Sequence, residues 1–240
     1  MSNHTWVGLA LIASLTAAGC GGSSGTSSVS SSKPPTKAAA EAAAASINLV
    51  AADLPSDYKG APHQSSSDDK AQTAAFAACA GASNVESDTV ADVNSDDFSK
   101  GAQLTMKQVT SDVQVVKSSS SASADLKAYQ SDKAQGCLAT FITKLLAKQS
   151  GGAGGATFGP PKVSRLQPSA PGIDGAFGYQ VTLTASAAGL TIPFEISIEG
   201  FLVKHSEISL TLLSVGGPFP TSDRDALFSK LASRSVTSAV

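Results

Sequence analysis

The densest cluster of potential metal ligands is the stretch Asp92-x-Asn94-x-Asp96-Asp97, where side-chain oxygens recur at every second residue. This spacing matches the first ligands of a calcium-binding EF-hand loop. Such a loop needs glycine at its sixth position and a bidentate glutamate at its twelfth, where this chain has Asp97 and Gln103. The stretch therefore predicts a solvated acidic loop, with loose calcium binding as the alternative, and we assign neither a metal ion nor another cofactor.

Histidine and glutamate residues offer two further candidates for acid–base or metal chemistry. His63 follows a proline, and His205 lies in a predicted hairpin turn. Neither is accompanied by the further ligands of a metal site, so both are interpreted as exposed residues. Glu195 and Glu199 share one face of a predicted strand, and paired carboxylates can hydrolyse glycosides. Polar residues that alternate along a half-exposed strand normally face solvent, so no catalytic residue is predicted.

The most specific candidate is Cys20, which follows an apolar stretch and three small residues. Residues 6–18 carry no charge and are too few to span a bilayer, which takes about 20 residues. They match the apolar region of a secretory signal peptide. The sequence Ala17-Ala18-Gly19-Cys20 resembles the lipobox of bacterial lipoproteins, with Ala17 in place of the usual leucine. The resemblance implies that residues 1–19 are cleaved and that the Cys20 thiol is acylated. The alternative is an ordinary secretory signal without a role for Cys20.

Export would also decide the state of the other two cysteines. With Cys20 lipidated, Cys79 and Cys137 remain as a pair of thiols in an oxidising compartment. We predict a disulfide bond between them. In the chain-entropy model this bond stabilises the fold by roughly 4 kcal/mol. The alternative is two separate buried thiols.

The organisation of the chain follows from composition and periodicity. Residues 20–47 are expected to form a Gly/Ser-rich tether and an alanine-rich helical spacer over 37–47. A single domain is expected over 48–237. Its predicted elements are a helix that Ser67 or Asp68 caps and Gly81 ends, a strand within 103–118 that alternates over 109–116, a long helix that bends or splits at Gly136, a three-stranded meander over 177–215 and a closing helix that Thr221 or Ser222 caps.

This order of elements predicts an α+β fold with an antiparallel sheet and helices packed on one face. The order, the "DLP" near residue 54, a cysteine in each of two helices and the "GGPFP" before the last helix resemble secreted actinobacterial lipoproteins of unassigned function. The domain also looks like the extracellular sensor domain of actinobacterial Ser/Thr kinases and, more distantly, the PsbP-like fold. The kinase sensor tends to have two disulfides where this chain can form one. The resemblance implies no catalytic residue.

Composition narrows the classes of function. The formal net charge is −2, charged residues make up 15% and aromatic residues 5% of the 240 residues, which argues against a nucleic-acid partner. We expect a lipoprotein anchored on the extracytoplasmic face of the cell membrane, which acts as a non-catalytic module for an apolar small molecule or an envelope protein. The alternatives are a cell-envelope hydrolase or accessory enzyme and a passive structural surface protein.

Overall fold

The computed structural model describes residues 34–240 except 65–66, 83–87, 103, 151–156 and 188. Within these residues the chain forms an antiparallel sheet of nine strands, in the order β1-β3-β4-β9-β8-β7-β5, with β2 also paired to β4 and β6 to β7. The predicted α+β class is confirmed. Cys20 and the predicted signal peptide lie outside the described residues.

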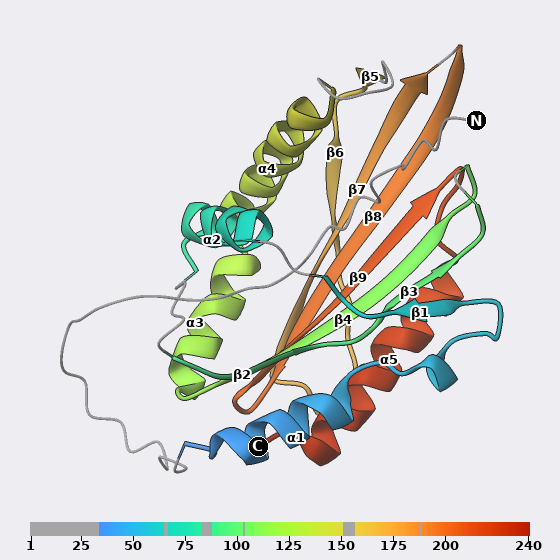
Figure 1. Ribbon diagram of the computed structural model, residues 1–240. Coiled ribbons are helices and arrows are strands. Elements are labelled where there is room, and N and C mark those ends of the chain that lie inside the picture. Colours follow the sequence, from blue (N-terminus) through green and yellow to red (C-terminus); the bar gives the residue numbers. More distant parts are fainter. Residues whose placement is uncertain (1–33, 65–66, 83–87, 103, 151–156, 188) are drawn as a thin grey trace.

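The helices precede, interrupt and follow the strands (Figure 1). The helices are α1 (Lys37–Ile47), the short 3₁₀ helix η1 (Ala51–Asp53), α2 (Ser67–Ala80), α3 (Ser119–Tyr129), α4 (Asp132–Ser150) and α5 (Thr221–Ser238). The strands are β1 (Lys59–Ala61), β2 (Thr89–Asn94), β3 (Asp97–Lys100), β4 (Lys107–Val116), β5 (Thr157–Phe158), β6 (Lys162–Leu166), β7 (Gly175–Ala187), β8 (Leu190–Val203) and β9 (Ser206–Val215).

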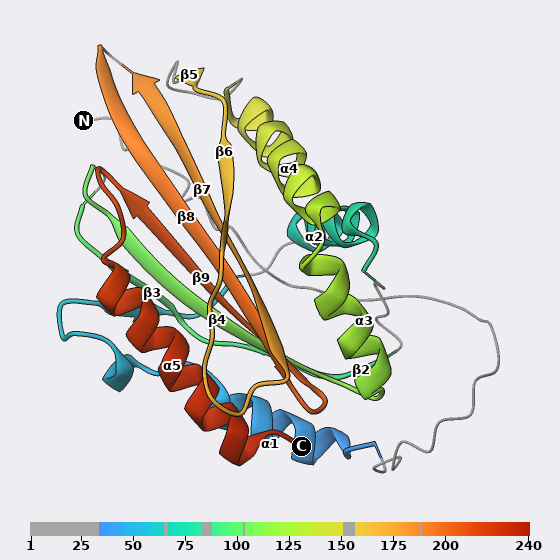
Figure 2. The ribbon, with the colours of Figure 1, turned by 180° about the vertical axis from the view of Figure 1, so that it is seen from behind.

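Helices cover both faces of the sheet, whereas the sequence predicted one covered face. α1 and α5 lie on one side, and α2, α3 and α4 on the other (Figures 1 and 2). The reason is that the central strands carry apolar side chains in both directions. On β9, Leu212 packs in the cluster under α1 and α5, while its neighbour Leu213 packs in the cluster under α2 and α4. Successive side chains of a strand point to opposite faces, so each cluster needs its own helical layer.

The alanine-rich helix α1 has the predicted bounds, but it is not a lightly packed spacer. Ala40, Ala44 and Ile47 are completely buried in the cluster under α1 and α5. Alanine side chains are small, so the helix backbone can approach the sheet closely. The Thr36 hydroxyl accepts a hydrogen bond from the Ala39 amide and caps the helix. The packed core therefore begins before residue 48.

The long predicted helix is broken between α3 and α4, not at Gly136. The Ser131 hydroxyl accepts a hydrogen bond from the Ala134 amide at the start of α4. The Tyr179 hydroxyl, which comes from β7, donates to the last carbonyl of α3 at Tyr129. Gly136 lies inside α4, where an added Cβ would meet nothing within 4 Å. The break is therefore fixed by a serine cap and a tertiary contact.

The predicted Cys79–Cys137 disulfide is present, and it links the last turn of α2 to α4 with 5.8 Å between the two Cα atoms. Cys79 is exposed rather than facing the core, whereas Cys137 is buried. The bond thus fastens α2 onto the outside of α4. In the described part of the chain, no helix combines the length and the apolar character that crossing a bilayer requires.

Candidate functional site

A band of polar side chains runs across β4 and β9 on the face that α3 covers. Its core is two cross-strand pairs, Asp112 opposite Ser209 and Gln114 opposite Glu207. Directly opposed residues of an antiparallel pair have side chains about 5 Å apart. Asp112, Gln114 and Ser209 are each less than a tenth exposed. The helix therefore buries polar groups that an uncovered strand face would leave in water.

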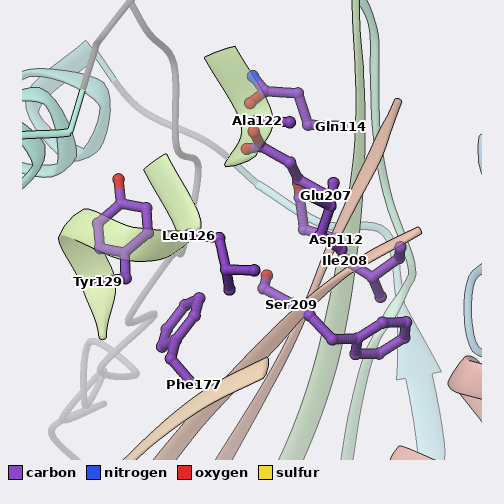
Figure 3. Close-up of a pocket in the computed structure, with 11 residues that line it drawn as sticks. Asp112, Gln114, Ala122, Leu126, Tyr129, Phe177, Glu207, Ile208 and Ser209 are labelled. Atoms are coloured by element: carbon purple, nitrogen blue, oxygen red, sulfur yellow. The ribbon is translucent and has the colours of Figure 1, made fainter. Parts of the chain in front are cut away.

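These residues form the floor of a pocket between the sheet and α3, with a volume of about 30 Å³. Figure 3 shows Asp112, Gln114 and Glu207 on one side of it, and Leu126, Tyr129 and Phe177 on the other. Asp112 Oδ2 and Glu207 Oε1 are buried without a hydrogen-bond partner. Gln114 is held by a 3.0 Å hydrogen bond from its Nε2 to Thr89 Oγ1. Buried polar atoms are nearly always hydrogen-bonded. The two unpartnered carboxyl oxygens therefore make this pocket a candidate binding site.

The electrostatics of the pocket are dominated by carboxyl groups. Burial raises the pKa of Glu207 to about 8, and the nearby carboxylates of Asp125 and Asp88 contribute to this shift. Burial raises the pKa of Asp112 well above its usual range, and the charge of Asp92 and a hydrogen bond with it act in the same direction. An acid in this environment keeps its proton at neutral pH unless a cation or a hydrogen-bond donor offsets its charge.

The opposite wall of the pocket is aromatic. The rings of Tyr129, from α3, and Phe177, from β7, have centroids 5.1 Å apart. Gly200 of β8 makes room for this arrangement, because a Cβ there would lie 2.4 Å from Phe177 Cε1. Leu126 and Phe177 are partly exposed, which places the edge of the pocket beside them.

A second, smaller cavity of about 10 Å³ shares Asp112 and Ser209 with the pocket. His63 lines it and is not exposed as predicted, since its side chain is 8% exposed and its Nδ1 donates to Asp97 Oδ1 over 2.9 Å. Its Nε2 has no partner, and neither has the hydroxyl of Thr211. The cavity is about the size of one water molecule. Unpartnered polar atoms are thus found in both cavities, and those of the smaller one lie next to His63.

The other predicted solvent-facing residues are also buried. His205 is 6% exposed, and its Nδ1 donates to the Val116 carbonyl over 3.1 Å. Glu195 accepts a hydrogen bond from the Phe219 amide. Glu199 is 2% exposed and pairs with Arg224 at 3.1 Å. Both glutamates lie on the face that α5 covers, so the expectation of an exposed strand face is wrong for them.

Burial raises the pKa of Glu199 to about 7 although Arg224 opposes the shift. Glu199 and Arg224 line a polar pocket of about 260 Å³ beside α5. Here the carboxylate already has its cation, in contrast to Asp112 and Glu207. In the pocket beside α5 the carboxylate is thus already neutralised by an arginine of the same chain. The pocket under α3 is the stronger candidate for a binding site, because its carboxyl oxygens lack a partner.

The stretch from Asp92 to Asp97 is not a loop, because it lies on β2 and β3 and the short turn between them. Its residues face three different partners. Asp92 contacts Asp112, Asn94 lines the smaller cavity, and Asp97 pairs with His63. Within the described ranges, no group of three or more His, Cys, Asp or Glu side chains is arranged to hold a metal ion.

Sequence reasoning missed Asp112, Gln114 and Glu207 as site residues. Asp112 and Gln114 occupy alternate positions of β4 and carry the signal of a solvent-facing strand edge. Helix α3 buries these side chains, and the residue pattern of the strand does not predict that a helix covers this face. No protein-family model matches the chain, and no curated protein matches it.

Proposed function

We propose that the protein is a lipid-anchored, extracytoplasmic and non-catalytic binding module, with its ligand site in the pocket under α3. Support for export comes from the lipobox-like sequence that ends at Cys20. The Cys79–Cys137 pair agrees with it, because disulfides persist mainly in oxidising compartments. The anchor would keep the domain at the membrane surface while the pocket binds its ligand.

One observation carries the binding function, namely the pair of unpartnered buried oxygens at Asp112 and Glu207. Each buried polar atom without a partner costs about 1–3 kcal/mol of stability. A site that keeps such atoms is costly to the fold unless a ligand supplies the missing hydrogen bonds. Local rules of folding are broken mainly where function requires it, which favours a binding site over a structural role for these residues.

Native mass spectrometry of the protein purified from membranes tests this function. The wild type should carry a small molecule or a partner protein, whereas Ala122→Leu, which fills the pocket from α3, should carry neither. The matched control is Ala45→Leu on the exposed side of α1, which should retain the ligand. Circular dichroism checks that each variant is folded. A wild type that carries neither a small molecule nor a partner protein, or an Ala122→Leu variant that binds as the wild type does, contradicts the assignment.

Fractionation of cells that express Cys20→Ser tests the anchor separately. The variant should leave the membrane fraction and should keep the Cys79–Cys137 bond, because the two features use different thiols. Retention of Cys20→Ser in membranes contradicts the lipid anchor. This result would leave the pocket assignment intact, since the two tests have separate readouts.

A further inference from the structure

We infer that the pocket under α3 binds a primary ammonium group, supplied by a free alkylamine or by a lysine side chain of a partner protein. This inference rests on the proposed binding function and names the chemistry of its ligand. It is carried by the charges, the unpartnered atoms and the aromatic wall of the pocket.

The charged groups that act on the two acids of the pocket are themselves carboxylates. The groups that act on Asp112 and Glu207 are the carboxylates of Asp92, Asp125 and Asp88, and each of them raises the pKa of its target. No lysine, arginine or histidine is among the described residues that line the pocket. A buried carboxylate needs a cation or several donors to remain charged. A cationic ligand would therefore supply the positive charge that the lining residues lack.

The unpartnered atoms point to the same ligand independently of the charge. Asp112 is 7% exposed, and its Oδ2 has no partner. Glu207 contributes a second unpartnered oxygen, and Ser209 lines the same floor with its hydroxyl. An ammonium group has three donors and no acceptor. The floor thus offers two unpartnered oxygens to the donors of an ammonium group.

The donors that the floor requires and the aromatic wall of the pocket favour one type of cation. A primary ammonium group has three N–H donors for the unpartnered oxygens of the floor, whereas a quaternary ammonium has none. The rings of Tyr129 and Phe177 would lie beside the bound group, and aromatic faces attract cations. Leu126, at the edge of the pocket, would contact the alkyl chain where it leaves.

Titration of the wild type with n-butylammonium chloride, followed by isothermal calorimetry, tests the inference. We expect saturable binding with release of a proton, because an ammonium ion that pairs with Glu207 displaces the proton that its raised pKa retains. Neutral n-butanol and tetramethylammonium should bind about tenfold more weakly or not at all. Asp112→Asn should weaken butylammonium binding by about tenfold or more, and Glu41→Gln on α1 should leave it unchanged.

A peptide with one lysine and its norleucine analogue separate the two sources of the ammonium group. Tighter binding of the lysine peptide than of butylammonium supports a partner protein, and the reverse order supports a free amine. Absence of binding by both amines overturns the inference. Binding of n-butanol as tight as that of butylammonium also overturns it, while the proposed binding function would stand.

Discussion

Replacement of Glu207 with glutamine tests the buried acidic pocket through the pH dependence of stability. Burial raises the pKa of Glu207 from 4.5 to about 8, with Asp125 and Asp88 as further contributors. Between these two values the folded protein holds a proton that the unfolded chain has released. The favourable contribution to the free energy of unfolding is therefore fully present below pH 4.5 and is lost as the pH rises through 8.

The expected size follows from proton linkage. One extra proton in the folded state changes the free energy of unfolding by about 1.4 kcal/mol for each pH unit. Over the interval between the two pKa values, Glu207 would cost the wild type at most about 5 kcal/mol. Glu207→Gln has no proton to lose. It should match the wild type near about pH 4.5 and exceed its stability by a few kcal/mol near about pH 9.

Urea unfolding followed by circular dichroism, repeated across this pH range, measures the difference between variant and wild type. Glu41→Gln is the matched control, because the Glu41 side chain on α1 is half exposed and its replacement should give a small difference at every pH. A stability difference for Glu207→Gln that is constant with pH would show that Glu207 is charged in the folded protein. That result would refute the description of Glu207 as a protonated, desolvated acid.

Three further predictions concern stability and use the same unfolding assay. Replacement of both Cys79 and Cys137 with serine should cost about 4 kcal/mol for a loop of 58 residues, and a loss below about 1 kcal/mol contradicts it. Asp53→Asn weakens the paired hydrogen bonds from Arg234 and should cost about 1–3 kcal/mol at neutral pH. Because the pKa of Asp53 is lowered from 3.8, the wild type should lose this advantage in acid. Tyr179→Phe removes the hydroxyl that donates to the end of α3 and should cost about 1–2 kcal/mol, and an unchanged midpoint contradicts it.

The parts of the fold that the sequence predicts are those with a strong local signal. The bounds of α1 follow from a run of alanines, and β4 and the β7–β9 meander follow from apolar alternation. β2 and β3 lack such a signal, because their polar residues read as an acidic loop. The position of the α3–α4 break depends on Tyr179, which is distant in sequence. Tertiary contacts of this kind are not encoded in a local window.

The candidate site could not be predicted from the sequence, because it too depends on tertiary contacts. Asp112 and Glu207 lie on different strands, and their proximity depends on the register of β4 against β9. His63 and Asp97 meet only when β1 pairs with β3. A polar residue on a strand has the same neighbours in sequence whether its face meets water or a helix. The disulfide, by contrast, followed from a count of thiols and an expected compartment.

The two apolar clusters on opposite faces have a consequence for how the protein opens. The disulfide joins α2 to α4, and both helices pack in the same cluster, so it leaves the layer of α1 and α5 unconstrained. Layers that share a sheet but bury separate side chains can open at different free energies. With the bond reduced, amide hydrogens of α2 and α4 should exchange before those of β4 and β9. A ligand bound between α3 and these strands would stabilise the contact between the helical layer, which opens more readily, and the strands β4 and β9, which open less readily.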